Sequence, residues 1–431
     1  MIIRDVSLVT MNDRGEVLRH VDVEIRKDRF TGSRPTGGPL PAGEEIIDGR
    51  GKVMMPGLMN MHSHIAMSLF RNYGNDVNLQ TWLEEYIWPR EALLTEEDIR
   101  AGSALNIAEM LTTGTTCFVD MYYEMDGVAR EVERMGIRAC LTRGLTGPDD
   151  GTRLKEQRKL YEDWHGRAGG RIRVKIGPHA IYTNDLDSLK AQKALNDELG
   201  CGFHIHIAET KKEVDDCLDR YGMTPVALFD RLGMLDGQTL AAHCVWLSEE
   251  DIQILAERGV HCIYNPASNM KLASGFMPVE DLMKAGVNVC LGTDGASSNN
   301  KQDMFREMYL GALIQKGRFL DPKALSAGEM LRMATINGAK ALGLDEELGS
   351  VEPGKKADFI LVDFDNVHHT PYPEDLEAAL VYSTDGRDVV LTAVDGQILV
   401  KDGKLLSSAG TEEDIRQRAE IAWKRVCEEE K

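Results

Sequence analysis

The 431-residue sequence lacks several features that mark particular protein classes. No apolar stretch is long enough to cross a membrane, and Met1 to Thr10 lacks the basic segment and apolar run of a signal peptide. Positive charge is scarce, because 50 lysines and arginines face 70 aspartates and glutamates, which gives a formal charge of -20. Such a charge disfavours nucleic-acid backbones and anionic membranes as partners. We therefore expect a cytoplasmic protein that binds neither nucleic acid nor membranes.

Paired cysteine motifs are also missing. The eight cysteines are scattered through apolar stretches without any C-x-x-C spacing. This pattern predicts reduced and mostly buried thiols rather than a disulfide framework or a zinc cluster. The lack of a P-C-x-x-C motif also excludes the cytidine-deaminase type of zinc site.

The two ends of the chain show β-strand patterns, whereas the long middle alternates short apolar runs with helical patterns. We predict a small β-sandwich built from both ends, with the middle as an inserted α/β unit. The C-terminal helix is expected to pack through Ile415, Ile421 and Trp423. The predicted segments are residues 1–55 and 346–410 for the sandwich, 56–345 for the insertion and 411–431 for the C-terminal helix.

The insertion contains eight candidate strands that alternate with helices. This number favours a (β/α)8 TIM barrel, with a doubly wound open sheet as the alternative. Six polar residues fall at or just past the carboxyl ends of these strands, where the active sites of such barrels lie. In an open sheet only those near the switch point could meet, so the barrel is preferred. The strands are 54–61, 115–120, 137–142, 174–178, 202–207, 239–243, 260–265 and 288–293, and the residues are His62, His64, His179, His206, His243 and Asp294.

The first of these strands ends in an H-x-H motif after Pro56 and Gly57, which suggest a hinge. Side chains two apart on a strand share a face, so His62 and His64 converge on one spot that suits a metal ion. A pair of core histidines is the alternative for this motif alone. A catalytic zinc site needs about three nitrogen or oxygen ligands and a position for water. The added candidates are His206 and Asp294.

The predicted fifth strand, residues 202–207, contains His204 and is followed by Glu209. Glu209 follows His206 just past the strand end, where a carboxylate beside a water molecule could shuttle protons. His204 shares the strand face of His206 but lies one layer deeper, so we expect it to be an interior histidine. For Asp294, the alternative to metal binding is a cap on the helix that follows.

Two loops were considered as parts of the binding pocket. The aromatic residues between 68 and 94 could form a pocket wall, or simply pack a helix, which is the commoner case at helical spacing. The polar loop after the seventh strand, with Asn265, Ser268, Asn269 and Lys271, is explained mostly by loop structure and capping, with substrate contact as a minority interpretation.

Taken together, these motifs resemble the amidohydrolase superfamily, and more closely its 5-methylthioadenosine/S-adenosylhomocysteine deaminases. The similarity runs through nearly the whole chain, and W-P-R-E at Trp88 to Glu91 belongs to it. The remaining spans are P-G-L-M-N-M-H-S-H, H-I-H-I-A-E-T, A-A-H-C-V, Y-N-P-A-S-N-M-K-L-A-S-G, L-G-T-D-G-A-S-S-N-N and G-S-V-E-P-G-K-K-A-D.

The resemblance implies a role for each matching residue. A single divalent metal would be bound by His62, His64, His206 and Asp294. It would be zinc in the first instance, although Fe2+ and Mn2+ accept the same ligands. A mononuclear site is implied, because the fourth strand ends in a histidine where dinuclear relatives have a carboxylated lysine. The other implied roles are Glu209 as general acid/base, His243 on the attacking hydroxide, Asp294 as a proton acceptor, Glu91 on the ribose, His179 on the substrate, and Arg143 and Arg153 on an amino-acid carboxylate.

The implied activity is hydrolytic deamination of an adenosine-type nucleoside with a modified 5′ position. The relatives are commonly homo-oligomers, so the resemblance also implies a homo-oligomer. The substrates implied are S-adenosylhomocysteine, 5′-methylthioadenosine, 5′-deoxyadenosine and adenosine. The alternative is an aminohydrolase or chlorohydrolase of the same fold acting on guanine, cytosine or an s-triazine. A non-catalytic scaffold is disfavoured, because the full set of candidate ligands is present.

Overall fold

The computed structural model describes residues 1–406 and 410–429. Residues 407–409 and 430–431, which belong to the predicted segments 346–410 and 411–431, lie outside the described residues. The described strands form three sheets, of nine, five and four strands.

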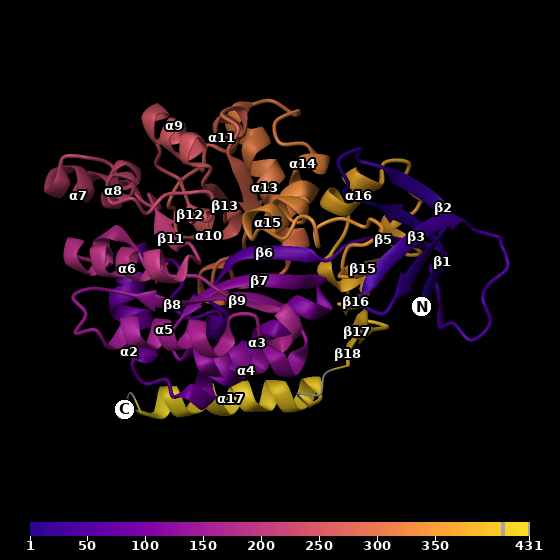
Figure 1. Ribbon diagram of the computed structural model, residues 1–431, viewed down its shortest axis with the longest axis horizontal. Coiled ribbons are helices and arrows are strands. Elements are labelled where there is room, and N and C mark those ends of the chain that lie inside the picture. The colour runs from indigo at the N-terminus through magenta and orange to yellow at the C-terminus, as the bar shows by residue number, and fades with distance from the viewer. Residues whose placement is uncertain (407–409, 430–431) are drawn as a thin grey trace.

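The nine-stranded sheet draws its strands from both ends of the chain. β15 pairs antiparallel with β5, so residues about three hundred positions apart become neighbours. Figure 1 shows these strands gathered at one end of the molecule, away from helices α5 to α9. The strands are β1 (Ile2–Val9), β2 (Val17–Arg26), β3 (Arg29–Pro35), β4 (Ile46–Asp48), β5 (Lys52–Pro56), β15 (Phe359–Asp363), β16 (Val389–Val394), β17 (Gln397–Lys401) and β18 (Lys404–Leu405).

The two other sheets are entirely parallel, as expected where helices connect successive strands. Both faces are apolar, so most strand residues are buried. The five-stranded sheet contains β6 (Leu58–Ser63), β7 (Thr115–Tyr122), β8 (Arg138–Leu145), β9 (Ile172–Val174) and β10 (Gly177–Pro178), and the four-stranded sheet contains β11 (His204–Ile207), β12 (Leu240–His243), β13 (His261–Tyr264) and β14 (Asn288–Leu291).

The predicted first barrel strand, residues 54–61, is two strands in different sheets. They separate at Gly57, where an added Cβ would lie 2.1 Å from Oγ1 of Thr116, so only glycine permits this close approach. The amide of Gly57 donates to Asp358 in the terminal sheet, and the next amide donates to Gly114 before β7. The chain therefore changes sheets between neighbouring residues, and the uninterrupted apolar run conceals this break in the sequence.

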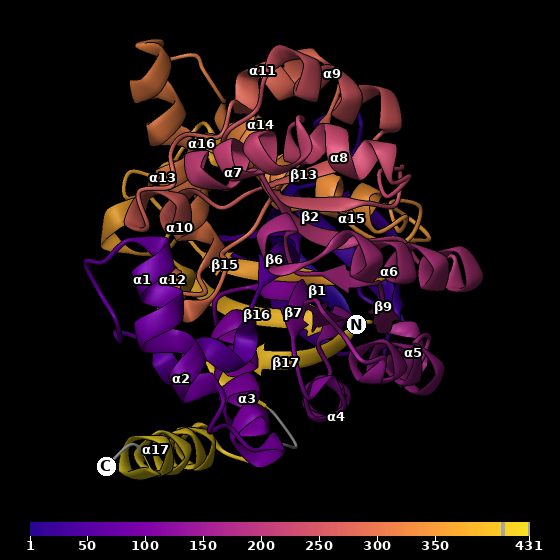
Figure 2. The ribbon, with the colours of Figure 1, turned by 90° about the vertical axis from the view of Figure 1, so that its left-hand side faces the viewer.

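Helices connect the parallel strands and surround them (Figure 2). Several end at a glycine in the left-handed conformation, such as Gly200 after α6 with φ 65°. The helices are α1 (Leu79–Thr81), α2 (Trp88–Glu91), α3 (Glu96–Thr112), α4 (Met125–Met135), α5 (Thr152–Trp164), α6 (Leu186–Leu199), α7 (Lys211–Tyr221), α8 (Pro225–Arg231), α9 (Glu249–Arg258), α10 (Pro266–Lys271), α11 (Val279–Lys284), α12 (Ala296–Asn299), α13 (Met304–Phe319), α14 (Ala327–Met333), α15 (Ile336–Ala341), α16 (Leu376–Tyr382) and α17 (Glu412–Glu429), with a π-helix η2 (Trp82–Ile87) and 3-10 turns η1 (Ile65–Phe70), η3 (Ala168–Gly170), η4 (Ile181–Thr183), η5 (Val367–His369) and η6 (Gly386–Asp388). Among the described helices, none combines the length and apolar character needed to span a membrane.

The C-terminal helix α17 lies alongside α3 (Figure 1). The prediction that Ile421 packs with Ile415 and Trp423 is wrong for Ile421, which is 61% exposed. Six residues at 100° each place Ile421 on a different face from Ile415. The buried face follows helical spacing instead, at Ile415, Ala419, Ala422 and Val426.

Candidate active site

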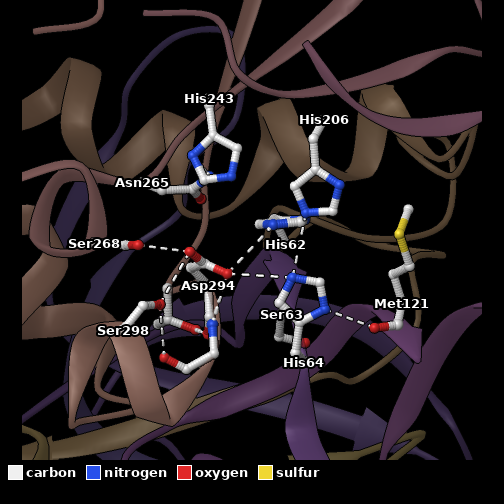
Figure 3. A network of polar contacts seen from close by, with 12 residues as sticks. His62, Ser63, His64, Met121, His206, His243, Asn265, Ser268, Asp294 and Ser298 are labelled. Atoms are coloured by element: carbon white, nitrogen blue, oxygen red, sulfur yellow. Dashed lines mark hydrogen bonds and ion pairs between the residues drawn. The ribbon is translucent and has the colours of Figure 1, made fainter. Parts of the chain in front are cut away.

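His62 and His64 lie at the end of β6, where the chain leaves the sheet for the turn η1. His206 lies on β11, and Asp294 follows β14. These strands are far apart in sequence, but their carboxyl ends meet at one edge of the sheets (Figure 3). The structure therefore brings together all four residues predicted as metal ligands.

The ligand atoms of these residues face a common point. Oδ1 of Asp294 lies 3.5 Å from Nε2 of His62 and 3.3 Å from Nε2 of His64. Nε2 of His206 lies 3.3 Å from Nε2 of His64. Nε2 of His62 is fully buried and has no hydrogen-bond partner among the described residues. Three imidazole nitrogens and one carboxylate oxygen form the nitrogen and oxygen set of a catalytic zinc site, and the unpartnered nitrogen is explained if an ion binds there.

The opposite ring nitrogens are bound in a way that prepares these imidazoles for a metal. Nδ1 of His64 donates to the carbonyl of Met121 at 2.6 Å, and Nδ1 of His206 donates to the carbonyl of His179 at 2.7 Å. A carbonyl only accepts, so each ring carries a proton on Nδ1 and turns Nε2, the nitrogen that would bind an ion, toward the site. This outer arrangement is typical of metal-binding histidines.

His204 provides the corresponding contact for His62. Its Nε2 lies 2.8 Å from Nδ1 of His62, and its Nδ1 lies 3.4 Å from Oγ1 of Thr142. The Thr142 hydroxyl donates to the carbonyl of Asp120, so it accepts from His204, which in turn accepts from His62. His204 is an interior histidine, as expected, and it also orients a candidate ligand, which the sequence did not reveal.

The charges of the site follow from burial and from Asp294. Burial lowers the pKa of His62 to about 4 and holds that of His206 well below its usual value, which favours the neutral rings that metal ligands need. Burial also opposes a charge on His64, but the Asp294 carboxylate outweighs it and raises the pKa of His64 to about 9. Burial alone would raise the pKa of Asp294, yet its contacts with His62 and His64 hold it well below the usual range. The site thus contains the ionised carboxylate of Asp294, which favours the cationic form of the neighbouring His64 ring.

Glu209 follows β11 and points into the same space. Burial raises its pKa above the ordinary value for a glutamate, as suits a carboxyl group that exchanges protons. Its Oε1 accepts from Oγ of Ser274 at 3.0 Å, and its Oε2 lies 3.8 Å from Nε2 of His243. Glu213 in the first turn of α7 accepts the backbone amides of Ala208 and Glu209 at 3.0 Å and 2.9 Å. Glu209 is therefore fixed both at its backbone amide, by Glu213, and at its carboxylate, by Ser274.

Several non-glycine residues at the carboxyl ends of the strands adopt left-handed backbone conformations, and three of them belong to or adjoin the site. These three are Ala208 after β11, His243 at the end of β12 and Asp294 after β14, with φ of 52°, 74° and 64°. Such conformations are costly and cluster where side chains must be aimed. Asp294 does not cap α12, whose N-cap is Gly295 without a side-chain bond. Its oxygens instead accept the Gly295 amide and the hydroxyls of Ser268 and Ser298 (Figure 3).

A pocket of about 540 Å³ opens over these groups. Its lining includes every residue predicted for the site except His62, which is buried beneath it. Glu91 at the end of α2 accepts from the Tyr122 hydroxyl at 2.6 Å, and burial raises its pKa. His179 after β10 contacts the Thr183 hydroxyl at 2.9 Å, and burial lowers its pKa to about 3, so the ring is neutral.

Both predicted arginines line the pocket, and each has an acidic neighbour. Nε of Arg143 donates to Glu156 at 2.9 Å, and Arg153 lies 3.9 Å from Asp149. These carboxylates were not foreseen, and they compensate the positive charge that a substrate carboxylate would meet.

The aromatic segment after η1 serves both roles considered for it. Trp82 and Trp88 line the pocket, together with Leu83 of the π-helix η2. Tyr73 instead packs against Tyr86 and against Trp423 of α17, with ring centroids 5.6 Å apart in both pairs.

The polar residues around α10 were underestimated. Ser268, Asn269 and Ser274 are buried and bind Asp294, His243 and Glu209 respectively. The position of this loop after the strand β13 was a usable signal, whereas the contact of Glu213 with two backbone amides had none in the sequence.

Comparison with known proteins gives one family. A family model described as the amidohydrolase family matches residues 53–399. The chain is 44% identical to a 5-methylthioadenosine/S-adenosylhomocysteine deaminase from Thermoanaerobacter pseudethanolicus, over 94% of each chain. It is 47% identical to a protein of the same name from Moorella thermoacetica, over 94% of this chain and 95% of the other. A 5′-deoxyadenosine deaminase from Methanothermobacter thermautotrophicus is 45% identical over 90% and 91% of the two chains.

Solved structures agree with these relatives. A crystal structure of an adenosine deaminase from Xanthomonas campestris with bound zinc superimposes with a TM-score of 0.93 at 32% identity, covering 99% of this chain and 98% of the other. A zinc complex of an atrazine chlorohydrolase from Arthrobacter aurescens has a TM-score of 0.89 at 24% identity, covering 98% and 99%, and indicates the fold alone. The resemblance found in the sequence is confirmed.

Proposed function

Because this chain belongs to the amidohydrolase family, we propose that it is a metal-dependent deaminase of adenosine-type nucleosides with a modified 5′ position. The products are the inosine analogue and ammonia. The observation that carries this proposal is the convergence of three histidine Nε2 atoms and Asp294 Oδ1 beside the buried Glu209, in one pocket large enough for a nucleoside.

The cofactor in this proposal is one divalent ion, zinc in the first instance, held by His62, His64, His206 and Asp294. The ligand atoms of His62, His64 and His206 lie close enough to share an ion, as do those of His62, Asp294 and His243. Such an ion lowers the pKa of a coordinated water from about 15.7 to about 7. A single ion is favoured because Lys175, the lysine within the predicted fourth strand 174–178, points away from the site and so does not supply the second ion's ligand found in dinuclear relatives. Its Nζ donates to the carbonyls of Cys201 and Gln238, which precede β11 and β12 at the other ends of the strands.

Residues of the chain carry out the proton transfers in this proposal. Glu209 accepts a proton from the attacking water and delivers it to N1 of the adenine ring as the water oxygen bonds to C6. His243 holds the oxygen, and Asp294 accepts the remaining proton from it. The C6–N6 bond then breaks and ammonia leaves with that proton, so that water and an adenosine become ammonia and an inosine.

Glu91 and His179 are proposed to bind the nucleoside. The half-buried Glu91 lies at the pocket wall, where its carboxyl can accept from ribose hydroxyls. The neutral ring of His179 faces the pocket and can pair with the purine. Arg143 and Arg153 line the part of the pocket proposed for the 5′ substituent, where they can bind the carboxylate of a homocysteine tail.

We also propose that the two parallel sheets close into one (β/α)8 barrel. Two contacts between them support closure: a parallel bridge joins Ile176 to Phe203, and the Asp294 amide donates to the carbonyl of His62 at 2.9 Å. The barrel corresponds to residues 56–345. The described parts of the segments 1–55 and 346–410 then form the terminal β-sandwich, and α17 is the C-terminal helix.

A homo-oligomer is proposed from the outer face of α13. Tyr309 and Leu313, one turn apart, are each 42% exposed, and Leu320 just after the helix is 90% exposed. An apolar helix face of this kind is typical of subunit interfaces. Light scattering should give more than one chain per particle, and Leu313→Glu should reduce that number if the face is the interface.

The test of the activity is a substrate panel with metal-loaded protein. The panel contains adenosine, 5′-deoxyadenosine, 5′-methylthioadenosine, S-adenosylhomocysteine, guanine and cytosine, with ammonia release as the readout. Activity on the 5′-modified adenosines supports the proposal. Activity restricted to the free bases would support the alternative function, and silence on all compounds with metal bound would contradict deamination.

A further inference from the structure

One short segment contacts three separate groups of the proposed site. The segment is α10 with the turn after it, residues 266–274, and each of its three polar contacts is made by a buried side chain. The contacts are Ser268 Oγ to Asp294 Oδ2 at 2.5 Å, His243 Nδ1 to Asn269 Oδ1 at 2.9 Å, and Ser274 Oγ to Glu209 Oε1 at 3.0 Å.

The contact with Asn269 determines which nitrogen of His243 carries the proton. An amide oxygen only accepts, so the ring donates from Nδ1 and Nε2 keeps its lone pair. Nδ2 of Asn265 lies 3.4 Å from the same Nδ1, and the shorter contact with Asn269, at 2.9 Å, decides the tautomer. Nε2 is the atom that faces Oε2 of Glu209. The ring can therefore accept a hydrogen bond on the side of the pocket. With the amide reversed, Nε2 would carry the proton and could only donate.

The contact with Ser274 distinguishes the two oxygens of Glu209. Oε1 receives the hydroxyl, and Oε2 is directed to the side of His243. A carboxyl group held by one oxygen keeps the other in a fixed position for proton transfer.

The segment is itself fixed in place. The Ser274 amide donates to the carbonyl of Asn269 at 2.9 Å, which closes the turn after α10. The carbonyl of Ser274 accepts from Nε1 of Trp246 at 2.6 Å. Lys271 donates to the carbonyl of Ser297 at 2.9 Å and to the Asn300 side chain, both in the segment that follows Asp294. A shift of α10 would therefore displace both Asn269 and Ser274.

We propose that Ser274 and Asn269 are positioning residues for the deamination. Ser274 fixes Glu209 so that Oε2 is the oxygen that carries the proton, and Asn269 fixes His243 with its proton on Nδ1. This inference rests on the proposed function, because it assigns these residues to the same reaction. Neither residue contacts the substrate or the metal in this assignment, so their removal acts on turnover rather than on binding.

The test compares Ser274→Ala with Ser274→Thr, which keeps the hydroxyl. For Ser274→Ala we expect kcat to fall about 10- to 100-fold, the effect of one hydrogen bond to a charged group, with KM and bound metal within about 3-fold of the parent. Ser274→Thr should recover most of the loss. An unchanged kcat, or a loss that parallels loss of metal, would overturn the role of Ser274.

Ser350→Ala is the matched control. Ser350 is also buried and also donates to a glutamate, at 2.5 Å to Glu352, but it lies beyond the lining of the pocket. Its replacement should lower thermal stability and leave kcat within about 2-fold. A loss of turnover equal to that of Ser274→Ala would show that the effect is a general consequence of removing a buried hydroxyl.

A second measurement is made on the parent enzyme. Nitrogen-15 NMR of the histidine rings in the metal-loaded enzyme distinguishes the two tautomers, with His243→Gln serving only to assign the signal. A His243 ring protonated on Nδ1 supports the inference, and one protonated on Nε2 overturns it for Asn269. If the parent enzyme deaminates nothing with metal bound, the proposed function fails, whereas an active parent with a normal Ser274→Ala variant contradicts the positioning role alone.

Discussion

Replacing Glu209 with glutamine isolates proton transfer from every other role of this side chain. Glutamine has the same size, and its amide oxygen can still accept from Ser274, as Oε1 does at 3.0 Å. Its NH2 group then faces Nε2 of His243, which can accept from it. The substitution therefore removes the ionisable oxygen and leaves the contacts of the pocket in place.

The size of the effect follows from the role assigned. General acid and base catalysis contributes about 10²- to 10⁴-fold, which corresponds to about 2.7–5.5 kcal/mol in the activation barrier. We expect kcat for 5′-methylthioadenosine to fall by that factor. KM should stay within about 3-fold, because the glutamine amide can still hydrogen-bond to N1 of the purine and the ribose contacts do not involve Glu209.

The assay follows the loss of adenine absorbance and the release of ammonia, with the metal content of each preparation measured by mass spectrometry. Glu257→Gln on α9 is a control, since this exposed carboxylate only accepts from Gln253 on the same helix. Near-normal turnover in Glu209→Gln would remove this residue from the mechanism. A loss of turnover that follows a loss of metal would show that Glu209 supports the ion instead.

Further predictions concern the metal, its support and the junction of the sheets. Removing metal with a chelator should abolish deamination and lower the melting temperature, since an ion at 1,000 times its Kd stabilises the native state by about 4 kcal/mol; zinc should restore both, and activity in demonstrably metal-free protein would contradict this. His204→Ala should weaken metal binding about 10- to 100-fold by releasing Nδ1 of His62, measured by competition with a chelating dye, and an unchanged affinity would refute the orienting role. Arg138→Met should lower the free energy of unfolding by about 3–5 kcal/mol in urea titrations, because the buried Arg138 binds Asp358 at 3.0 Å and Asp395 at 2.9 Å; a loss under 1 kcal/mol would show that the carboxylates find other partners.

The sequence was informative about the site because strand ends in such folds meet at one edge. Residues at the ends of several candidate strands could be assigned to one site without knowing any distance, and the family resemblance added Glu91, which lies on a short helix with no strand pattern. The structure brings these residues to one pocket. The convergence of the four candidate ligands was therefore predictable from position and residue type.

Other contacts could not be predicted, because they depend on three-dimensional packing. The break between β5 and β6 is concealed in a continuous apolar run and results from the close approach of Gly57 to Thr116. The acidic neighbours of Arg143 and Arg153 come from a helix and a loop whose orientation the sequence leaves open. The error at Ile421 has a simpler cause, since helical spacing from Ile415 already excludes it from the buried face.

In the proposed function, His62, His64, His206 and Asp294 hold one metal ion that activates deamination. The most direct measurement is a titration of metal-free protein with zinc while deamination of 5′-methylthioadenosine is followed. The account predicts no activity without metal, a linear rise, and a plateau at about one ion per chain. Activity before zinc is added, or silence at full occupancy, would contradict it.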